Sequence, residues 1–282
     1  MTTRPELTDD AIVDFDHHSD EFNLNELAIN ANLRRKCPVA WNKDYGGFWF
    51  LSSYAAVSQA ARDDDTFAHK YEPNAADGVD YQGEMGVPRP EGQPALGIGE
   101  VDGPYHQALR RALAPFFSPG AVDRMRPFME QSVHWFLDQR IGDGQMDLVL
   151  DYASPVPAIL TMRLMGLPHD NWQLYANLFH SVMAVRQDST EYADAIAEVP
   201  AMMNGLLTFA ATRRADPGHD LTSFLVRFEF DGKRLDDTQL LGILWNLIGG
   251  GIDTTTSQTS LSLLHVGTHP DLRQQLIDRP WL

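Results

Sequence analysis

The chain has 282 residues, of which 43% are hydrophobic and 22% are charged. This ordinary globular composition excludes a disordered, collagen-like or disulfide-scaffold protein. The 39 acidic and 22 basic residues give a formal net charge of −17. Because a nucleic-acid binder needs Lys and Arg to neutralise phosphates, we expect no nucleic acid and no anionic membrane surface as a partner.

Cysteine use and the N-terminus indicate the compartment. Cys37 is the single cysteine, so no intrachain disulfide can form, which fits a reducing environment. The first ten residues contain no cationic segment followed by an apolar stretch, as a secretory signal would. The longest apolar run, 240–252, is too short to span a bilayer. We therefore expect a cytoplasmic protein that does not enter membranes.

Apolar residues recur at spacings of three and four through most of the chain, which predicts a mainly α fold with a small β-sheet. One hairpin is expected from 39–41 and 48–51, joined by a turn-rich segment. A second, over 228–235, has Asp231-Gly232 at its turn.

The segment 71–100 is expected to be irregular, because it contains six glycines and four prolines. A loop of this length inside a compact domain is usually functional or disordered. A binding loop and a simple surface excursion both remain open.

A helix is predicted after Asp102, with Pro104 suited to its first turn. His106 and Arg110 are spaced i, i+4, so they project from one face and could together bind an anion. The alternative is an ordinary solvated helix face. Between residues 104 and 126 there are four arginines and one acid, a local charge of +3 in an acidic chain.

The stretch 235–270 predicts a long helix with an unusual middle. Asp236 is a plausible N-cap with Gln239 three residues later. Three consecutive glycines, 249–251, each cost about 1 kcal/mol in a helix interior, and the five polar residues 253–257 also disfavour it. Gly250, Thr254 and Ser257 would share one face, beside a gap left by glycine. The alternative is a loop at 249–251, with Asp253 capping a second helix.

The run Gly-Gly-Ile-Asp-Thr-Thr at 250–255, followed by His-Pro at 269–270, resembles the central helix of the cytochrome P450 haem-thiolate monooxygenases. The resemblance implies haem b as cofactor, with Gly250 and Gly251 over its distal face. It gives catalytic roles to Asp253 and Thr254, which relay protons for O–O cleavage and support dioxygen.

The His-x-x-x-Arg helix is also similar to that of bacterial soluble members of the family, where this pair holds the haem propionates. His106 and Arg110 are then cofactor-binding residues, and a guanidinium fork suits a carboxylate. The resemblance implies a monooxygenase that inserts one oxygen atom from O2 into a small organic substrate. A ferredoxin-type protein would donate electrons, facing the remaining arginines.

Two family elements are absent from the sequence: a Glu-x-x-Arg pair, and the Phe-x-x-Gly-x-x-x-Cys-x-Gly loop that supplies the haem thiolate. Cys37 does not match, because Asn30, Leu33 and Val39 stand at the flanking positions. It is expected to be a small buried hydrophobe in a turn, and no residue is assigned as a metal ligand. We therefore expect residues 1–282 to be one cytochrome P450-like domain truncated at its C-terminus and inactive alone.

The sequence leaves one other function open and disfavours another. A non-catalytic helical protein that binds an apolar ligand, or haem through other residues, remains the alternative. A hydrolase or phosphate-handling enzyme using Asp253 is disfavoured, because neither Gly-x-Ser-x-Gly nor Gly-x-x-x-x-Gly-Lys occurs.

Overall fold

The computed structural model describes residues 11–84, 95–184 and 189–281. They belong to two compact units, one up to residue 93 and one from residue 94 onward. Helices dominate and the sheets are small, so the predicted fold class is confirmed. A single domain over 1–282 stays a prediction.

The first unit contains a small three-stranded sheet with the order β1-β2-β3. β1 runs parallel to β2, and β2 is antiparallel to β3 with Trp41 opposite Trp49. The predicted first hairpin is therefore confirmed. The elements of this unit are β1 (Ile12–Val13), α1 (Asp20–Lys36), β2 (Val39–Asn42), β3 (Phe48–Leu51), α2 (Tyr54–Ala60), β4 (Tyr71–Glu72) and β5 (Tyr81–Gln82).

β4 and β5 pair as antiparallel strands inside the segment that was expected to be irregular. That expectation is wrong here, because strands of two residues are too short to show an alternating pattern in the sequence. Residues 85–94 of the same segment lie outside the described residues.

Cys37 follows α1 as its C-cap and precedes β2, so its predicted place in a turn is confirmed. Its burial was predicted wrongly, since the side chain is only partly buried. The thiol donates a hydrogen bond to the Val39 carbonyl oxygen at 3.0 Å, which gives it a local polar partner in the turn.

The second unit is helical, with one short hairpin. Its elements are α3 (Gly103–Leu113), α4 (Pro119–Ile141), α5 (Pro155–Met165), α6 (Trp172–Ala184), α7 (Thr190–Ala215), α8 (Leu221–Leu225), β6 (Glu229–Phe230), β7 (Lys233–Arg234), α9 (Asp237–Thr268) and α10 (Pro270–Asp278). Asp231 and Gly232 join β6 to β7 with φ of 51° and 73°. Two left-handed residues match the twist of a tight hairpin, so this hairpin is confirmed.

α9 is one continuous helix of 32 residues, and the alternative of a loop at its glycines is wrong. Its capping box is complete: the Asp236 side chain accepts from the Gln239 N–H at 2.8 Å, and the Gln239 side chain accepts from the Asp236 N–H at 3.1 Å. These two bonds satisfy backbone donors that have no partner within the first turn of a helix.

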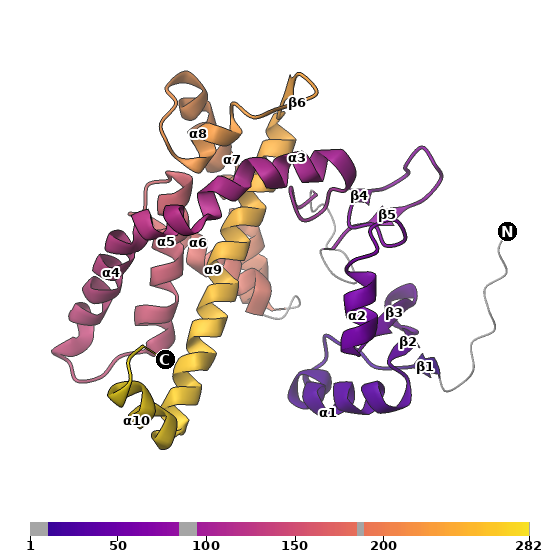
Figure 1. Ribbon diagram of the computed structural model, residues 1–282, viewed down its shortest axis with the longest axis horizontal. Coiled ribbons are helices and arrows are strands. Elements are labelled where there is room, and N and C mark those ends of the chain that lie inside the picture. Colours follow the sequence, from indigo (N-terminus) through magenta and orange to yellow (C-terminus); the bar gives the residue numbers. More distant parts are fainter. Residues whose placement is uncertain (1–10, 85–94, 185–188, 282) are drawn as a thin grey trace. The chain divides into compact units, whose positions relative to one another are not determined.

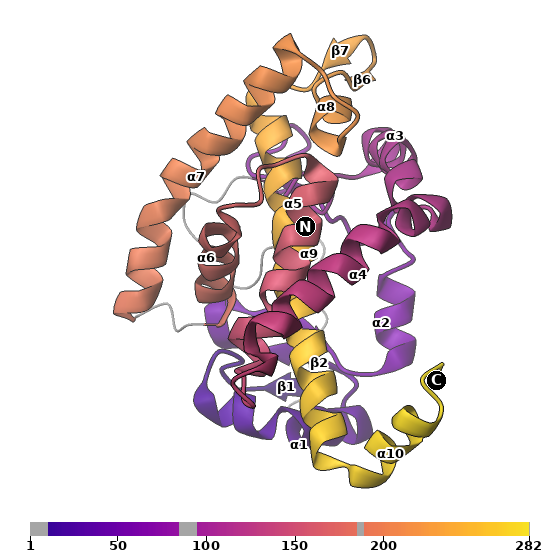
Figure 2. The same cartoon turned by 90° about the vertical axis from the view of Figure 1, so that its left-hand side faces the viewer.

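The core of the second unit lies between α9 and α5. α9 contacts α5, α6 and α7, and Figure 2 shows α5 beside its middle. Five apolar side chains on one side of α9 are almost fully buried: Leu240, Ile243, Leu244, Ile248 and Ile252. α5 contributes Ala158, Met162 and Met165 to the same cluster. Burial of large apolar side chains at about 1.5–3 kcal/mol each makes this contact the main stabilising one.

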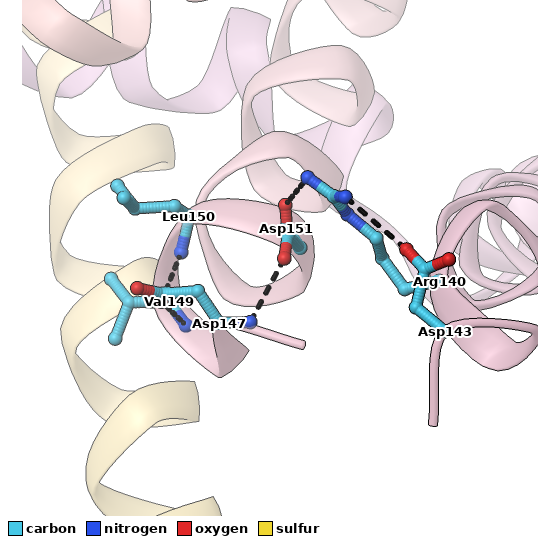
Figure 3. Close-up of polar contacts among 6 residues, drawn as sticks. All are labelled: Arg140, Asp143, Asp147, Val149, Leu150 and Asp151. Carbon is cyan, nitrogen blue, oxygen red and sulfur yellow. Dashed lines mark hydrogen bonds and ion pairs between the residues drawn. The ribbon is translucent and has the colours of Figure 1, made fainter. Parts of the chain in front are cut away.

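A polar network holds the turn between α4 and α5 (Figure 3). Arg140, near the end of α4, lies 2.9 Å from Asp151 and 3.4 Å from Asp143. Asp151 also accepts a hydrogen bond from the Asp147 N–H at 2.8 Å. That backbone bond, and then Arg140, hold the pKa of Asp151 below its ordinary value. The six-residue π-type turn 148–153, which contacts α9, is thereby fixed.

Replacement of Asp151 by Asn is expected to destabilise the protein at neutral pH. A lowered pKa in the folded state means that the carboxylate stabilises the fold above its unfolded value of 3.8. This contribution is lost as the pH falls through the lowered pKa. The free energies of unfolding of the wild type and the variant should therefore converge in acid. Urea unfolding followed by circular dichroism across this range measures the difference. Asp143→Asn is the control, and an equal loss there would contradict the assignment.

Candidate functional site

The three glycines in the middle of α9 have different surroundings. A Cβ on Gly249 would lie 2.8 Å from the Phe179 ring, and one on Gly251 would lie 2.4 Å from the Thr161 hydroxyl oxygen. A Cβ on Gly250 would have no atom within 4 Å. Gly249 and Gly251 are therefore explained by the close packing of α6 and α5, whereas Gly250 opens a space.

Another close approach was not predicted from the sequence. A Cβ on Gly242 would lie 2.6 Å from the Ala95 carbonyl oxygen, and one on Gly97, at φ of +46°, would lie 2.5 Å from the Ile243 backbone. The segment before α3 therefore rests directly on the α9 backbone. The sequence does contain a signal for it, because an isolated glycine inside a helical pattern often has a packing reason.

The exposed face of α9 carries the polar residues that the sequence placed together. Gly250, Thr254 and Ser257 are all exposed, as their shared face predicts. The Thr254 hydroxyl donates to the Gly250 carbonyl oxygen at 2.7 Å. The same bond to the carbonyl four residues earlier is made by Thr256, Ser260, Ser262 and Thr268. These bonds satisfy the hydroxyls inside the helix, so the polar run does not break it.

Asp253 lies at the edge of this face, with 19% of its side chain exposed. Its Oδ1 is 3.6 Å from Nδ1 of His180 on α6, an ion pair when the imidazole is protonated. No motif in the sequence points to His180, because the contact joins residues far apart in the chain. The acid and the alcohol differ in burial, because Thr254 is exposed while Asp253 is mostly covered.

α3 presents His106 and Arg110, as predicted. Leu109 and Leu113 anchor it in the core, and the Tyr105 ring packs 5.3 Å from Phe230. Burial raises the pKa of the Tyr105 hydroxyl above its ordinary value. With the opposite side anchored, Arg110 is exposed and His106 is partly exposed.

The other arginines of this region do not share one environment. Arg111 is exposed on α3, and Arg126 pairs with Asp123 at 3.0 Å on α4. Arg124 lines a separate cavity with residues of α5 and α7. The local charge of +3 is therefore divided between at least two places.

Neither a metal centre nor a membrane helix is found in the part of the chain that the structure describes. In 11–84, 95–184 and 189–281, no three His, Cys, Asp or Glu side chains are grouped so that they could hold a metal ion. Within the same ranges, no helix combines the length and the apolar character needed to cross a bilayer.

The sequence relatives are bacterial monooxygenases and hydroxylases. Linalool 8-monooxygenase of Pseudomonas putida is 26% identical over 262 residues, which cover 90% of this chain and 64% of that protein. Mycinamicin IV hydroxylase/epoxidase of Micromonospora griseorubida is 31% identical over 190 residues, which cover 66% of this chain and 47% of that protein. The chain thus spans about half to two thirds of the length of these relatives. No family model matches it.

The solved structures agree. A mutant of P450 EryK in complex with erythromycin B is 29% identical with a TM-score of 0.66, covering 85% of this chain and 57% of that one. Cytochrome P450 CYP268A2 of Mycobacterium marinum is 21% identical and has the same fold, with a TM-score of 0.79. The match covers 99% of this chain and 69% of that one. By sequence and by fold, the chain resembles the bacterial cytochrome P450s.

Two glycine substitutions, one residue apart, should change stability in opposite directions. Gly250→Ala adds a methyl group to open space and should stabilise α9 by up to about 1 kcal/mol. Gly251→Ala places its methyl group against buried, β-branched Thr161 and should cost about 1–3 kcal/mol. Urea unfolding measures both changes.

The double variant Gly251→Ala/Thr161→Ala controls for the helix itself, and should be less destabilised than the sum of the two single changes. Equal stability of Gly250→Ala and Gly251→Ala would show that α5 does not approach α9 as described.

Proposed function

We propose that the protein to which this chain belongs is a haem-dependent monooxygenase, which inserts one oxygen atom of O2 into a small organic substrate. The relatives' names support this chemistry. The observation that carries it here is the open, exposed face of α9, where Gly250 and Thr254 adjoin the partly covered carboxylate of Asp253. Residues 1–282 would form most of one such domain.

The residues present fit a haem. The absence of any atom within 4 Å of a Cβ on Gly250 leaves room for a flat group to approach the backbone. The exposed guanidinium of Arg110 and the neighbouring His106 offer donors for the two propionates, and a planar fork suits a carboxylate. Haem b, when bound, supplies the oxygen chemistry. Gly251 would act by keeping α5 close to α9.

Thr254 and Asp253 have different parts in this proposal. Because the Thr254 hydroxyl donates its hydrogen bond to the Gly250 carbonyl oxygen at 2.7 Å, its lone pairs can accept a hydrogen bond from a group on the open side. The Asp253 carboxyl would deliver protons to that side, as cleavage of an O–O bond requires. The Nδ1 of His180, 3.6 Å from the Asp253 Oδ1, can pair with this carboxylate when the imidazole is protonated.

An electron donor and a location complete the proposal. The exposed Arg111 on α3, which is not assigned to the haem, favours an acidic partner, such as a ferredoxin-type protein. The acidic composition and the single cysteine support the cytoplasm. The proposed substrate class is a small organic molecule.

Thr254→Ala should uncouple the reaction in the haem-loaded full-length enzyme. Loss of a hydrogen bond to a group that carries or develops a charge costs about 1.5–3 kcal/mol. The amount of product per electron consumed should therefore fall about tenfold. Product and NADH consumption are measured together in the presence of a redox partner. Thr255→Ala, the exposed neighbour, is the control. An unchanged product yield for Thr254→Ala would contradict the role given to its hydroxyl.

A haem titration of this chain tests the cofactor assignment directly. Haem absorbance should saturate, and Arg110→Gln should weaken binding about tenfold, since one charge-assisted contact to a propionate is lost. Arg111→Gln, which changes the adjacent exposed arginine, should bind haem as the wild type does.

Two results of this titration would each contradict one expectation, either the propionate role of Arg110 or the inactivity of this chain alone. Equal haem affinity of Arg110→Gln and wild type removes the propionate assignment. A thiolate-type spectrum of the reduced chain under carbon monoxide would show that Cys37 ligates the iron and that the chain alone carries the catalytic ligand.

A further inference from the structure

A cavity of about 640 Å³ lies within the second unit, away from the α9 face described above. Its lining comes from the start of α4, the end of α5, the end of α7 and the residues that lead into α8. These four elements are labelled in Figure 2. Its ionisable lining residues are Arg124, Arg163, His169, Arg213, His219 and Asp220.

The cavity is positively charged in a strongly acidic chain. Three guanidinium groups face one carboxylate, which leaves a surplus of +2 with neutral imidazoles. Asp220 is committed to Arg213, with its Oδ2 2.8 Å from the Arg213 Nε. Among the residues that the structure describes, Arg124 and Arg163 have no carboxylate within ion-pair distance. Two cations at this cavity are therefore not neutralised by the described part of the protein.

Aromatic rings and the backbone hold two of these arginines in place. The Arg163 guanidinium lies over the Phe128 ring, 5.2 Å from its centre, and that of Arg213 lies 4.7 Å from the centre of the Phe209 ring. Arg213 also donates to the Gly166 carbonyl oxygen at 3.2 Å. Stacking uses the flat face of a guanidinium and leaves its in-plane N–H donors for an anion.

The rest of the lining is apolar. Phe116, Met125, Leu164 and Leu167 contribute, and Leu167 is almost fully buried. Phe116 is supported from behind by Phe224, with ring centres 5.2 Å apart. A fully hydrated inorganic ion would leave this surface uncovered, whereas an anion with an apolar body would cover it.

We propose that this cavity is a binding site for a small organic anion. Its carboxylate or phosphate group would be held by Arg124 and Arg163, and its apolar body would lie on Phe116 and Leu164. The volume is within the range of small-molecule sites. The lining contains no residue of α3 or α9, so the site is independent of the proposed oxygen chemistry.

Binding of phenyl phosphate and of benzoate to the whole chain tests the site, with inorganic phosphate as the probe that lacks an apolar body. Isothermal titration at constant ionic strength should show one saturable site for phenyl phosphate or benzoate, and the stronger of the two identifies the anionic group. Inorganic phosphate should bind more weakly, because it cannot use Phe116 and Leu164.

Variants locate the binding. Arg163→Gln and Arg124→Gln should each weaken the tighter probe about tenfold, the loss of one charge-assisted contact. The affinity of Arg163→Lys for this probe should lie between those of the wild type and Arg163→Gln, because lysine keeps the charge but lacks the planar fork of N–H donors. Arg126→Gln is the matched control: it lies on the same helix as Arg124, is exposed and ion-paired to Asp123, and does not line the cavity. Thermal unfolding verifies that each variant is folded.

Three results would overturn the proposal. They are no saturable binding below about 10 mM, an equal loss of affinity in Arg126→Gln, and inorganic phosphate binding as tightly as phenyl phosphate. The haem titration reports on a different place in the molecule, so the failure of one proposal does not imply failure of the other.

Discussion

The backbone of α9 is approached closely on its packed side, and the second unit depends on this. Gly242 meets the segment 95–97, Gly249 meets the Phe179 ring and Gly251 meets Thr161. A glycine in a helix interior costs about 1 kcal/mol, so three such positions need compensation. It comes from the buried apolar face that the same approach brings against α5 and α6. A Cβ at any of these positions would force the segment 95–97, the Phe179 ring or the Thr161 side chain to shift.

The opposite side of α9 obeys a different constraint. There Gly250 has open space, and Thr254 and Ser257 are exposed. The hydroxyl of Thr254 donates to the Gly250 carbonyl, which keeps a polar run compatible with a helix. Asp253 lies at the boundary between the two sides, near His180. A carboxylate there is largely withdrawn from water and still has a partner in His180 when that imidazole is protonated.

The polar network between α4 and α5 and the cavity at the other end of α5 show how arginines are used in this acidic chain. Arg140 is committed to two carboxylates and fixes a turn. Arg163 is instead held by an aromatic ring, and none of the described carboxylates neutralises its charge. The difference follows from the surroundings, because Arg140 lies beside two carboxylates whereas Arg163 lies over a ring face.

Features that depend on neighbouring residues can be predicted from the sequence. The capping box at Asp236, the left-handed pair Asp231-Gly232 and the His106–Arg110 helix all act within a few residues, so spacing and residue type suffice to predict them. The motif at 250–255 also pointed to the family. The pair β4–β5 was missed, because strands of two residues carry no period.

The sequence by itself thus determined the helical class, the caps and turns and the polar face of α9, all of which depend on contacts within a few residues. Only the tertiary structure decided that Gly251 packs on Thr161 while Gly250 stays open, that His180 meets Asp253, and that Cys37 is only partly buried. It also gathered Arg124 and Arg163 around one cavity. These contacts join distant parts of the chain, and the periodicity of a single sequence contains no information about which distant residues meet.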